Sequence, residues 1–461
     1  MTINLNEKDV QQNNTLTIFS LLTIFVFLSM EIEAREPYES TYQPRITNNL
    51  VIKNVTILDG KGAKLLQTDV SISAGEITKI AKNIVDDQAK IIDGVGKWLT
   101  PGIIDVHSHL GVYPSPSINA TSDGNESTSP NTARVWAEHS VWPQDPQFGL
   151  ALAGGVTTLQ ILPGSANLFG GRGVTLKNVP SRTVQGMKFP GAPQSLKMAC
   201  GENPKRVYGG KSKSPSTRMG NVAGYRAAWI KAKEYQEKLN NSDLKEEDKP
   251  DRDLTMETLV GVLNGEILVH NHCYRADEMA NMIEIAREFD YKITAFHHAV
   301  ESYKIADLLA EQDICSAMWV DWWGFKLEAF DAIQQNIGLV DKAGACAIVH
   351  SDSSRDIQRL NQEAAKAMSA MLRMGKTVAP EKAITWITSN PAKALGIAER
   401  TGRIEVGYAA DLVLWNSNPF SVYSRADLVL IDGYLYFDRN DPSKQPITDF
   451  SLGQTHRKFS Q

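Results

Sequence analysis

Between residues 101 and 398, short apolar runs alternate with segments of helical hydrophobic spacing, and this alternation most restricts the possible folds. Helical spacing is clearest at Met279, Met282, Ile283 and Ala286, which follow the i, i+3, i+4, i+7 pattern. Strands that alternate with helices predict a parallel sheet with crossover helices. The seven apolar runs are IIDVHSHL, GVTTLQILPG, SLKMACGE, GEILVHNH, YKITAFHH, DICSAMWV and ACAIVHSD. An eighth strand in the GVTLKNVP region would complete an α/β barrel, although the count alone also allows an open sheet.

Both ends of the chain add strands of another kind. Residues 48–84 contain short alternating runs separated by DGKG and AGE turns, which is typical of a small antiparallel sheet. Residues 403–436 show the same pattern. We therefore expect residues 45–100 and 399–440 to form one composite β-sandwich beside a barrel of residues 101–398. At 461 residues the chain is long enough for both parts.

Two polar segments interrupt this pattern and have the composition of insertions. Residues 111–131 are rich in Ser, Asn and Pro and follow a His-x-His motif, so we expect a loop that covers the substrate. Residues 231–253 are highly charged, which predicts a solvated helix and loop.

The N-terminal segment differs from the rest of the chain. Residues 15–30 form an uncharged apolar run about as long as the core of a signal peptide and short for a membrane span. Cleavage after Ala34 would suit the small-residue rule, whereas Lys8 lies between acidic neighbours where a signal peptide prefers positive charge. Residues 1–34 therefore predict export, to the periplasm or as a secreted protein, with an uncleaved membrane anchor as the alternative.

The charge of the chain limits its partners. Lys and Arg total 48 against 53 Asp and Glu, a net charge of -5, and no long basic run occurs. These values argue against a nucleic-acid partner and favour a small-molecule or short-peptide substrate. The sequence leaves the formation of a homo-oligomer open.

The four cysteines are widely spaced, and no CxxC pair occurs among them. Three of them lie within or beside apolar runs that predict strands. We therefore expect buried free thiols rather than disulfides. The four residues are Cys200, Cys273, Cys315 and Cys346.

Histidines gather at the carboxyl ends of the predicted strands. Because side chains two apart in a strand point the same way, His107 and His109 are expected to converge on one point. A single histidine would more often be structural, but four strand ends at one barrel mouth share the pattern. Imidazole and carboxylate are the usual ligands of catalytic zinc, so this pattern favours a metal site. The residues concerned are His107, His109, His270, His272, His297, His298, His350 and Asp352.

The chain also contains six ordered motifs: PGIIDVHSHL, GVTTLQILPG, TAFHHA, VHSDSS, ITSNPAKALGI and GRIEVGYAADLVLWNSNP. Across residues 48–437, these motifs resemble the amidohydrolase superfamily, most closely its imidazolonepropionase-like members. The resemblance implies a (β/α)8 TIM barrel beside a small β-sandwich built from both chain ends. It also implies one or two divalent metals per chain, usually zinc.

The resemblance further implies particular metal ligands. In that family the first strand provides an HxH pair, which matches His107 and His109. The eighth strand provides an aspartate, which matches Asp352.

Histidines from strands five and six complete the ligand set of the family. We prefer His272 to His270, because HCYRADEM resembles the pattern that runs into the next helix in related members. We prefer His298 to His297, because its place before AVES resembles the single histidine of relatives. His270, His297 and His350 are then substrate contacts or packing neighbours.

A bridging group from strand four separates two-metal from one-metal members. In SLKMACGENPKR, Lys197 would bridge as a carboxylated lysine, or Glu202 would bridge directly. The alternative is structural, with Lys197 paired to an acid and Glu202 capping the next turn. We expect two metals, bridged by one of these residues.

These residues suggest a hydrolytic mechanism. A metal lowers the pKa of bound water from about 15.7 towards ~7, and Asp352 would accept the proton and pass it to the leaving nitrogen. His270, Arg275 and His350 are candidates to contact the substrate, where its carbonyl oxygen gains negative charge. We expect the segments HNHCYRADE and DWWGFK to line the pocket, the latter with Trp322, Trp323 and Lys326. The alternative is that these aromatic residues are ordinary core.

The expected reaction is hydrolysis of the C–N bond of an amide or cyclic amide. Prolidase-like dipeptide cleavage and deamination use the same constellation, so the sequence leaves them open. A nucleotide-binding protein is disfavoured, because the glycines of residues 164–173 follow neither the GxGxxG nor the P-loop arrangement. An exported metal-bound binding protein fits less well, because such a protein needs no proton shuttle beside its metal.

Overall fold

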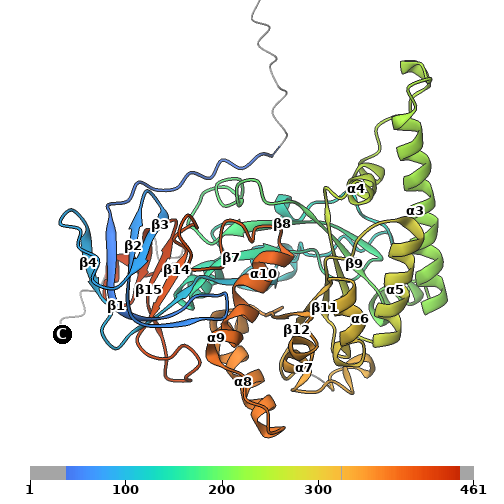
Figure 1. Cartoon of the computed structure of the whole chain (residues 1–461). Coiled ribbons are helices and arrows are strands. Elements are labelled where there is room, and N and C mark those ends of the chain that lie inside the picture. Colours follow the sequence, from blue (N-terminus) through green and yellow to red (C-terminus); the bar gives the residue numbers. More distant parts are fainter. Residues whose placement is uncertain (1–37, 323, 447–461) are drawn as a thin grey trace, which may run out of the picture. The chain divides into compact units, whose positions relative to one another are not determined.

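Eight strands of the central region form one curved sheet, drawn in cyan to orange in Figure 1. The computed structural model describes residues 38–322 and 324–446. Neighbouring strands are hydrogen-bonded in unbroken order from β13 back to β6. The strands are β6 (Ile103–Ser108), β7 (Val156–Ile161), β8 (Phe169–Lys177), β9 (Ser195–Ala199), β10 (Leu268–Cys273), β11 (Ala295–His298), β12 (Cys315–Met318) and β13 (Cys346–Val349). The seven predicted runs are therefore all strands.

The barrel closes between β6 and the chain that follows β13. Asp352 N–H donates to the carbonyl of His107 at 3.0 Å, and Ser351 N–H donates to Asp105 Oδ1 at 3.2 Å. The carboxylate of Asp105 also accepts from the Ser351 hydroxyl and from His107 N–H. Burial raises the pKa of Asp105 to about 7, against the lowering effect of these hydrogen bonds. This seam holds the His-x-His backbone against that of Asp352.

The eighth strand, β8, lies in the predicted region but runs in the opposite direction to the others. It pairs antiparallel with β7 and β9, whereas the remaining neighbours in the sheet are parallel. Residues 162–168 alone connect β7 to β8, and this connection is too short for a crossover helix. One strand thus departs from the expected parallel arrangement.

Helices cover the outside of the strands, as α5, α6 and α7 show in Figure 1. The predicted helical spacing is confirmed in α5, because Met279, Met282, Ile283 and Ala286 are all buried. The charged segment 231–253 contains the end of α3 and a largely exposed loop, as expected. The α-helices are α1 (Pro146–Ala153), α2 (Glu202–Gly209), α3 (Arg218–Asn240), α4 (Leu254–Leu263), α5 (Ala276–Phe289), α6 (Ala306–Glu311), α7 (Asn336–Lys342), α8 (Leu360–Arg373), α9 (Pro380–Ala383) and α10 (Ser389–Ala394). Short 3₁₀ helices lie at Asn119–Thr121, Ala137–His139, Glu246–Asp248, Ser302–Lys304, Leu327–Ala329, Asp356–Arg359, Ile384–Ile387 and Pro442–Lys444.

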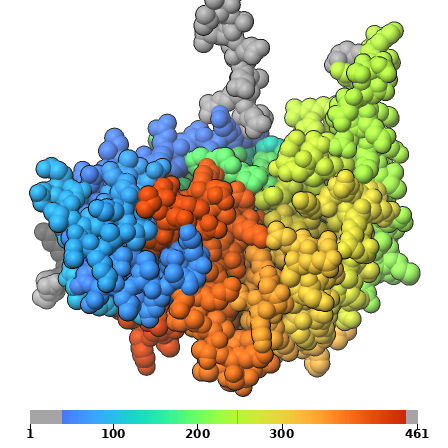
Figure 2. Space-filling view, in the orientation of Figure 1, coloured from blue at the N-terminus to red at the C-terminus, as the bar shows by residue number. Residues whose placement is uncertain are grey.

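A second sheet is built from both ends of the described chain, as predicted. Its order is β16-β15-β14-β5-β1-β2-β3, and β4 also pairs with β1. Strand β5 joins the two halves, because it pairs with β1 on one side and with β14 on the other. Figure 2 shows the corresponding blue and orange-red segments side by side. The strands are β1 (Leu50–Leu58), β2 (Lys64–Ser73), β3 (Glu76–Ala81), β4 (Lys90–Asp93), β5 (Trp98–Pro101), β14 (Leu412–Trp415), β15 (Ala426–Ile431) and β16 (Tyr434–Asp438).

A buried network of charged groups joins β8 of the barrel to this second sheet. Lys177 Nζ lies 2.7 Å from Asp432 Oδ1 and 3.4 Å from both carboxylate oxygens of Asp411. Tyr42 donates to the other oxygen of Asp432, and Thr401 donates to Asp411 at 2.8 Å. These side chains are buried, so their hydrogen bonds compensate for the loss of water.

All four cysteines form disulfides, so the expectation of free thiols is wrong. Cys200 pairs with Cys273, and Cys315 pairs with Cys346. The partners are 73 and 31 residues apart in sequence. The order of the barrel strands brings them together, because Cys315 and Cys346 are directly opposite in the β12–β13 pairing. Spacing along the chain could not reveal this.

Among residues 38–322 and 324–446, no helix is long and apolar enough to cross a membrane. The predicted signal peptide or anchor, residues 1–34, lies outside the described residues. Trp323 of the predicted pocket wall also lies outside them.

Candidate active site

A cavity of about 620 Å³ opens where the carboxyl ends of the barrel strands meet. Side chains from β6, β10 and β11, and from the segment after β13, reach into it. Among its lining residues are five of the predicted ligands, which are His107, His109, His272, His298 and Asp352. The cavity therefore lies at the barrel face where the chemistry was expected.

His107 and His109 converge, as the strand alternation of the sequence predicts. Their Nε2 atoms lie 3.3 Å apart. Nδ1 of His109 lies 2.9 Å from the carbonyl oxygen of Leu162. Because a carbonyl only accepts, this nitrogen carries the proton, and Nε2 of His109 presents its lone pair to the cavity.

Asp352 lies directly beside this pair. Its Oδ1 is 3.2 Å from Nε2 of His109 and 3.5 Å from Nε2 of His107, while its Oδ2 is 3.9 Å from Nδ1 of His298. Burial alone would raise the pKa of Asp352, but its neighbours, first His109 and then His350 and Lys197, hold this pKa below its ordinary value. Asp352 is thus a carboxylate in a pocket of imidazoles.

Lys197 and Glu202 take different places, although the sequence made both candidate bridges. Lys197 is fully buried on β9, and its Nζ lies 3.3 Å from Nε2 of His107. Burial lowers the pKa of Lys197 to about 7, with the charge of Asp352 acting in the opposite direction. Glu202 begins α2, where its Oε1 lies 3.6 Å from Nζ of Lys326. The structure brings Lys197, and not Glu202, among the histidines.

The histidines of β10 and β11 divide into two pairs. His272 and His298, the two histidines preferred as ligands, line the cavity. His270 and His297 lie deeper in the barrel, where His270 Nδ1 is 2.8 Å from His297 Nε2. Burial lowers the pKa of all four rings, so each is neutral at physiological pH.

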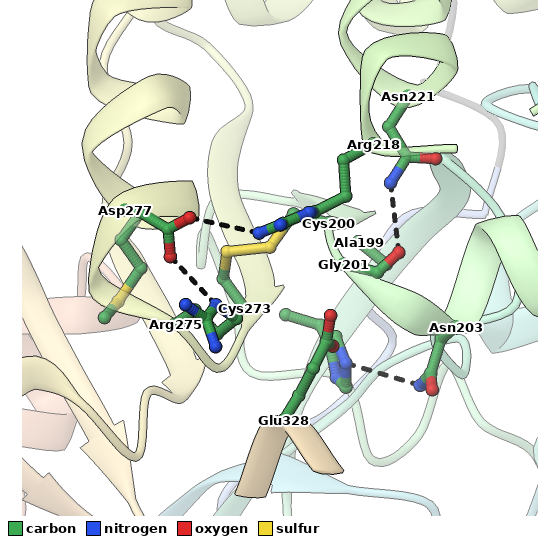
Figure 3. The surroundings of a disulfide bond; sticks show 12 residues. Ala199, Cys200, Gly201, Asn203, Arg218, Asn221, Cys273, Arg275, Asp277 and Glu328 are labelled. Atoms are coloured by element: carbon green, nitrogen blue, oxygen red, sulfur yellow. Dashed lines mark hydrogen bonds and ion pairs between the residues drawn. A yellow bond between two sulfur atoms is a disulfide. The ribbon is translucent and has the colours of Figure 1, made fainter.

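His350 and Arg275, both candidate substrate contacts, are placed differently. His350 is buried, its Nε2 lies 3.3 Å from the backbone N–H of His298, and burial lowers its pKa to about 3. Arg275 immediately precedes α5, and its Nε donates to Asp277 at 3.0 Å. Figure 3 shows this pairing beside the disulfide of Cys200 and Cys273. The side chain of Arg275 is therefore engaged outside the cavity.

Aromatic side chains form one wall of the cavity. Trp319 stacks on the ring of His298 at 4.1 Å between centroids, and the indole N–H of Trp319 has no partner among the described residues. Trp322 and Lys326 line the cavity as the sequence predicted. Tyr274, from the predicted segment HNHCYRADE, also lines it, whereas sequence reasoning did not single out the further lining residues Tyr113, Asn125, Asn203 and Trp319. Trp319 lies at the end of the predicted run DICSAMWV, and Tyr113 and Asn125 belong to the predicted loop 111–131, so their positions in the chain were the signal that could have identified them.

The arrangement of ligand atoms suits a divalent cation. His107, His109 and Asp352 offer ligand atoms within 4.8 Å of one another, as do His107, His298 and His350. The lone pair on Nε2 of His109 faces the carboxylate of Asp352, and two acceptors repel each other unless a proton or metal cation lies between them. His107 belongs to both groups, which places it at the centre of the candidate site.

Comparison with known proteins extends this picture. A family model described as the amidohydrolase family matches residues 301–436. Amidohydrolase tasK of Hapsidospora irregularis is 32% identical over 397 residues, which are 80% of this chain but 40% of tasK. This chain therefore spans about two-fifths of the length of that relative.

Two further similarities cover most of both partners. The imidazolonepropionase of Colwellia psychrerythraea is 24% identical over 408 residues, 79% of this chain and 89% of that enzyme. The crystal structure of an amidohydrolase from Thermotoga maritima MSB8 is 38% identical, with a TM-score of 0.78 over 85% of this chain and 100% of that one.

The fold and site define a barrel hydrolase with a histidine and aspartate cluster at the carboxyl ends of its strands. This chain covers the whole of the Thermotoga maritima amidohydrolase at 38% identity, which identifies the class as the amidohydrolases. The chain belongs to the amidohydrolase family. The predictions of this family, of the barrel fold and of an enzyme are confirmed.

Proposed function

We propose that this protein is an exported, metal-dependent hydrolase that cleaves the carbon–nitrogen bond of a small amide, cyclic amide or short peptide. One observation carries the proposal. The acceptor atoms of His109 and Asp352 face each other beside His107 at the floor of a cavity of about 620 Å³. The names of two relatives, an amidohydrolase and an imidazolonepropionase, support the choice of bond.

His107, His109, His298 and Asp352, with His272 or His350, are the residues that would hold a divalent metal, with zinc as the proposed ion. When bound, such a metal lowers the pKa of a water molecule and polarises a carbonyl group. Asp352 accepts the proton of the attacking water and returns it to the leaving nitrogen.

The aromatic wall supports the binding of an apolar group beside the scissile bond. Tyr274, Trp319, Trp322 and Phe325 line this side of the cavity. Lys326, which lies 4.6 Å from the ring centroid of Tyr274, adds a positive group at this wall. An N-acyl amino acid or a dipeptide offers both an apolar side chain and a carboxylate.

The function is tested by a substrate screen on purified protein whose metal content has been measured. N-acyl amino acids, dipeptides and cyclic amides are compared before and after treatment with a chelator. We expect hydrolysis of at least one class, lost with the metal and restored by zinc. Tight metal and substrate binding without turnover in any class would instead favour a metal-bound binding protein.

We further propose that Lys197 bridges two metals as a carboxylated lysine. The nitrogen of a neutral lysine forms a bond to the carbon of CO₂ and loses a proton, which gives a carbamate. Burial supports this step, because it lowers the pKa of Lys197 to about 7 and so increases the neutral fraction.

Replacement of Lys197 by methionine should lower the metal content from two towards one per chain. Methionine has a similar length but no nitrogen to carboxylate. Glu202→Gln is the matched control, because Glu202 pairs with Lys326, and it should keep the wild-type content. Elemental analysis of metal-replete protein measures both. A wild-type value near one metal would contradict the two-metal site.

The disulfides support the proposal that the chain is exported. Disulfides form and persist mainly in oxidising compartments. If residues 15–30 direct export, the mature chain should begin near Arg35. N-terminal sequencing of protein recovered from the periplasm or medium tests this. A soluble cytoplasmic protein that keeps Met1 would contradict it, and a membrane-bound protein that keeps Met1 would favour the anchor.

A further inference from the structure

Three histidine rings form a continuous row from the candidate metal site into the barrel interior. Nδ1 of His107 lies 2.9 Å from Nδ1 of His297. Nε2 of His297 lies 2.8 Å from Nδ1 of His270, and Nε2 of His270 lies 3.1 Å from the carbonyl oxygen of Ala394. The rings of His270 and His297 are completely buried, and His107 is 1% exposed.

The row is unusual for the interior of a barrel, which branched apolar side chains ordinarily fill. An imidazole placed there loses water, and this costs free energy unless both ring nitrogens find partners. Both nitrogens of His270 and of His297 do so within the row. In contrast, Nδ1 of His272 and of His298 has no hydrogen-bond partner among the described residues.

The carbonyl of Ala394 sets the direction of every hydrogen bond in the row. Ala394 is the last residue of α10, and the carbonyls of the last turn of a helix have no intrahelical partner. Because this oxygen only accepts, Nε2 of His270 must donate to it, and Nδ1 of neutral His270 must then accept. His297 therefore donates through Nε2 and accepts through Nδ1. His107 in turn donates through Nδ1, which leaves the lone pair on its Nε2.

The other side of His107 agrees with this assignment. Its Nε2 lies 3.3 Å from Nζ of Lys197, and the ammonium form of this lysine only donates, so it pairs with a lone pair on Nε2. A charged His297 would donate through both ring nitrogens, which would reverse its hydrogen bond with His107 and keep the one to His270. Its complete burial opposes a charge at that ring.

We propose that His297 and His270 are positioning residues that hold His107 in the tautomer whose Nε2 lone pair faces the metal. This inference rests on the proposed metal site. His109 gains the same tautomer directly from the carbonyl of Leu162. His107 instead gains it through two intervening rings, so that α10 anchors the orientation of a ligand at the opposite end of the row.

Neutron crystallography of the wild-type protein tests the row through its protons. We expect deuterium on Nδ1 of His107, on Nε2 of His297 and on Nε2 of His270. Deuterium on Nε2 of a metal-free His107, with a bare Nδ1, would overturn the proposal. This readout does not depend on metal binding or activity. A wild-type protein that binds no metal would contradict the proposed metal site and leave the proton positions as a separate result.

Metal affinity of variants tests the consequence. His297→Phe keeps a planar ring without nitrogens, and loss of such a partner ordinarily weakens metal binding by about 10- to 100-fold. His297→Gln retains a donor and an acceptor and should recover part of this loss. His139→Phe makes the same change at a half-exposed ring and should bind metal like the wild type.

Zinc competition with a chromophoric chelator measures these affinities, and urea denaturation checks that each variant is folded. Zinc binding by folded His297→Phe within about threefold of wild type would overturn the positioning role, since a partner of this kind contributes at least tenfold. If His297→Phe does not fold, the zinc affinity of His297→Gln and the neutron result still test the proposal. Weaker zinc binding by His297→Gln than by the wild type would support the positioning role, and equal binding would contradict it.

Discussion

Replacement of Asp352 by asparagine should lower kcat by about 10²- to 10⁴-fold on whichever substrate the screen identifies. At 1.36 kcal/mol per tenfold, this corresponds to roughly 3 to 5 kcal/mol of activation free energy. Asparagine keeps the size of the side chain and one oxygen, but it cannot take the proton of the attacking water. Metal content and substrate affinity should therefore survive while turnover falls.

Two other variants make the measurement specific. Asp356→Asn makes the same change four residues later, where the carboxylate pairs with Arg359, and it should leave kcat unchanged. His107→Ala should weaken metal binding itself, so excess zinc should recover part of its activity. If Asp352→Asn turns over within about threefold of wild type, Asp352 is not the proton shuttle, and the mechanism proposed here is wrong.

Replacement of Lys177 by methionine should lower the free energy of unfolding by about 3 to 5 kcal/mol. The change leaves the buried carboxylates of Asp411 and Asp432 without their cation. Lys79→Met makes the same substitution at an exposed position of β3 and should change stability little. Urea denaturation followed by tryptophan fluorescence measures both variants.

The loss of unfolding free energy in Lys177→Met should depend on pH, which provides a second measurement. Burial and the charge of Asp411 raise the pKa of Asp432, and Lys177 opposes this rise. Without Lys177, the folded protein binds a proton more readily than the unfolded chain does, so its stability increases as the pH falls. The deficit should therefore shrink in mildly acidic buffer. A second change, Asp432→Asn, should recover part of it at neutral pH. A Lys177→Met variant within about 1 kcal/mol of wild type would show that the network is not a major link between barrel and sheet.

The main features of the fold were predictable because they depend on local patterns. Alternation of apolar runs with helical spacing located seven barrel strands, and alternating runs at both ends located the second sheet. Strand alternation also placed His107 and His109 on one side, and their Nε2 atoms lie 3.3 Å apart. In these cases, the information lies in residues a few positions apart.

Other parts of the site depended on contacts that the sequence does not display. Lys197 and Glu202 are five positions apart and seemed equal as bridges, but the strand places the lysine among the histidines and the helix places the glutamate beside Lys326. Arg275 follows the His272 segment, yet it pairs with Asp277 at the start of the next helix. Side-chain direction at the end of a strand separates these outcomes.

By itself, the sequence determined the strand content, the two-part architecture and the histidines and aspartate that meet at the barrel mouth. These follow from periodicity, because a side chain's face is set by its position within its own strand or helix. Only the tertiary structure decided the direction of β8, the pairing of Cys200 with Cys273 and the row from His107 to Ala394. Each of these depends on which strands become neighbours and how a connection turns, and such long-range choices leave no local periodic signal.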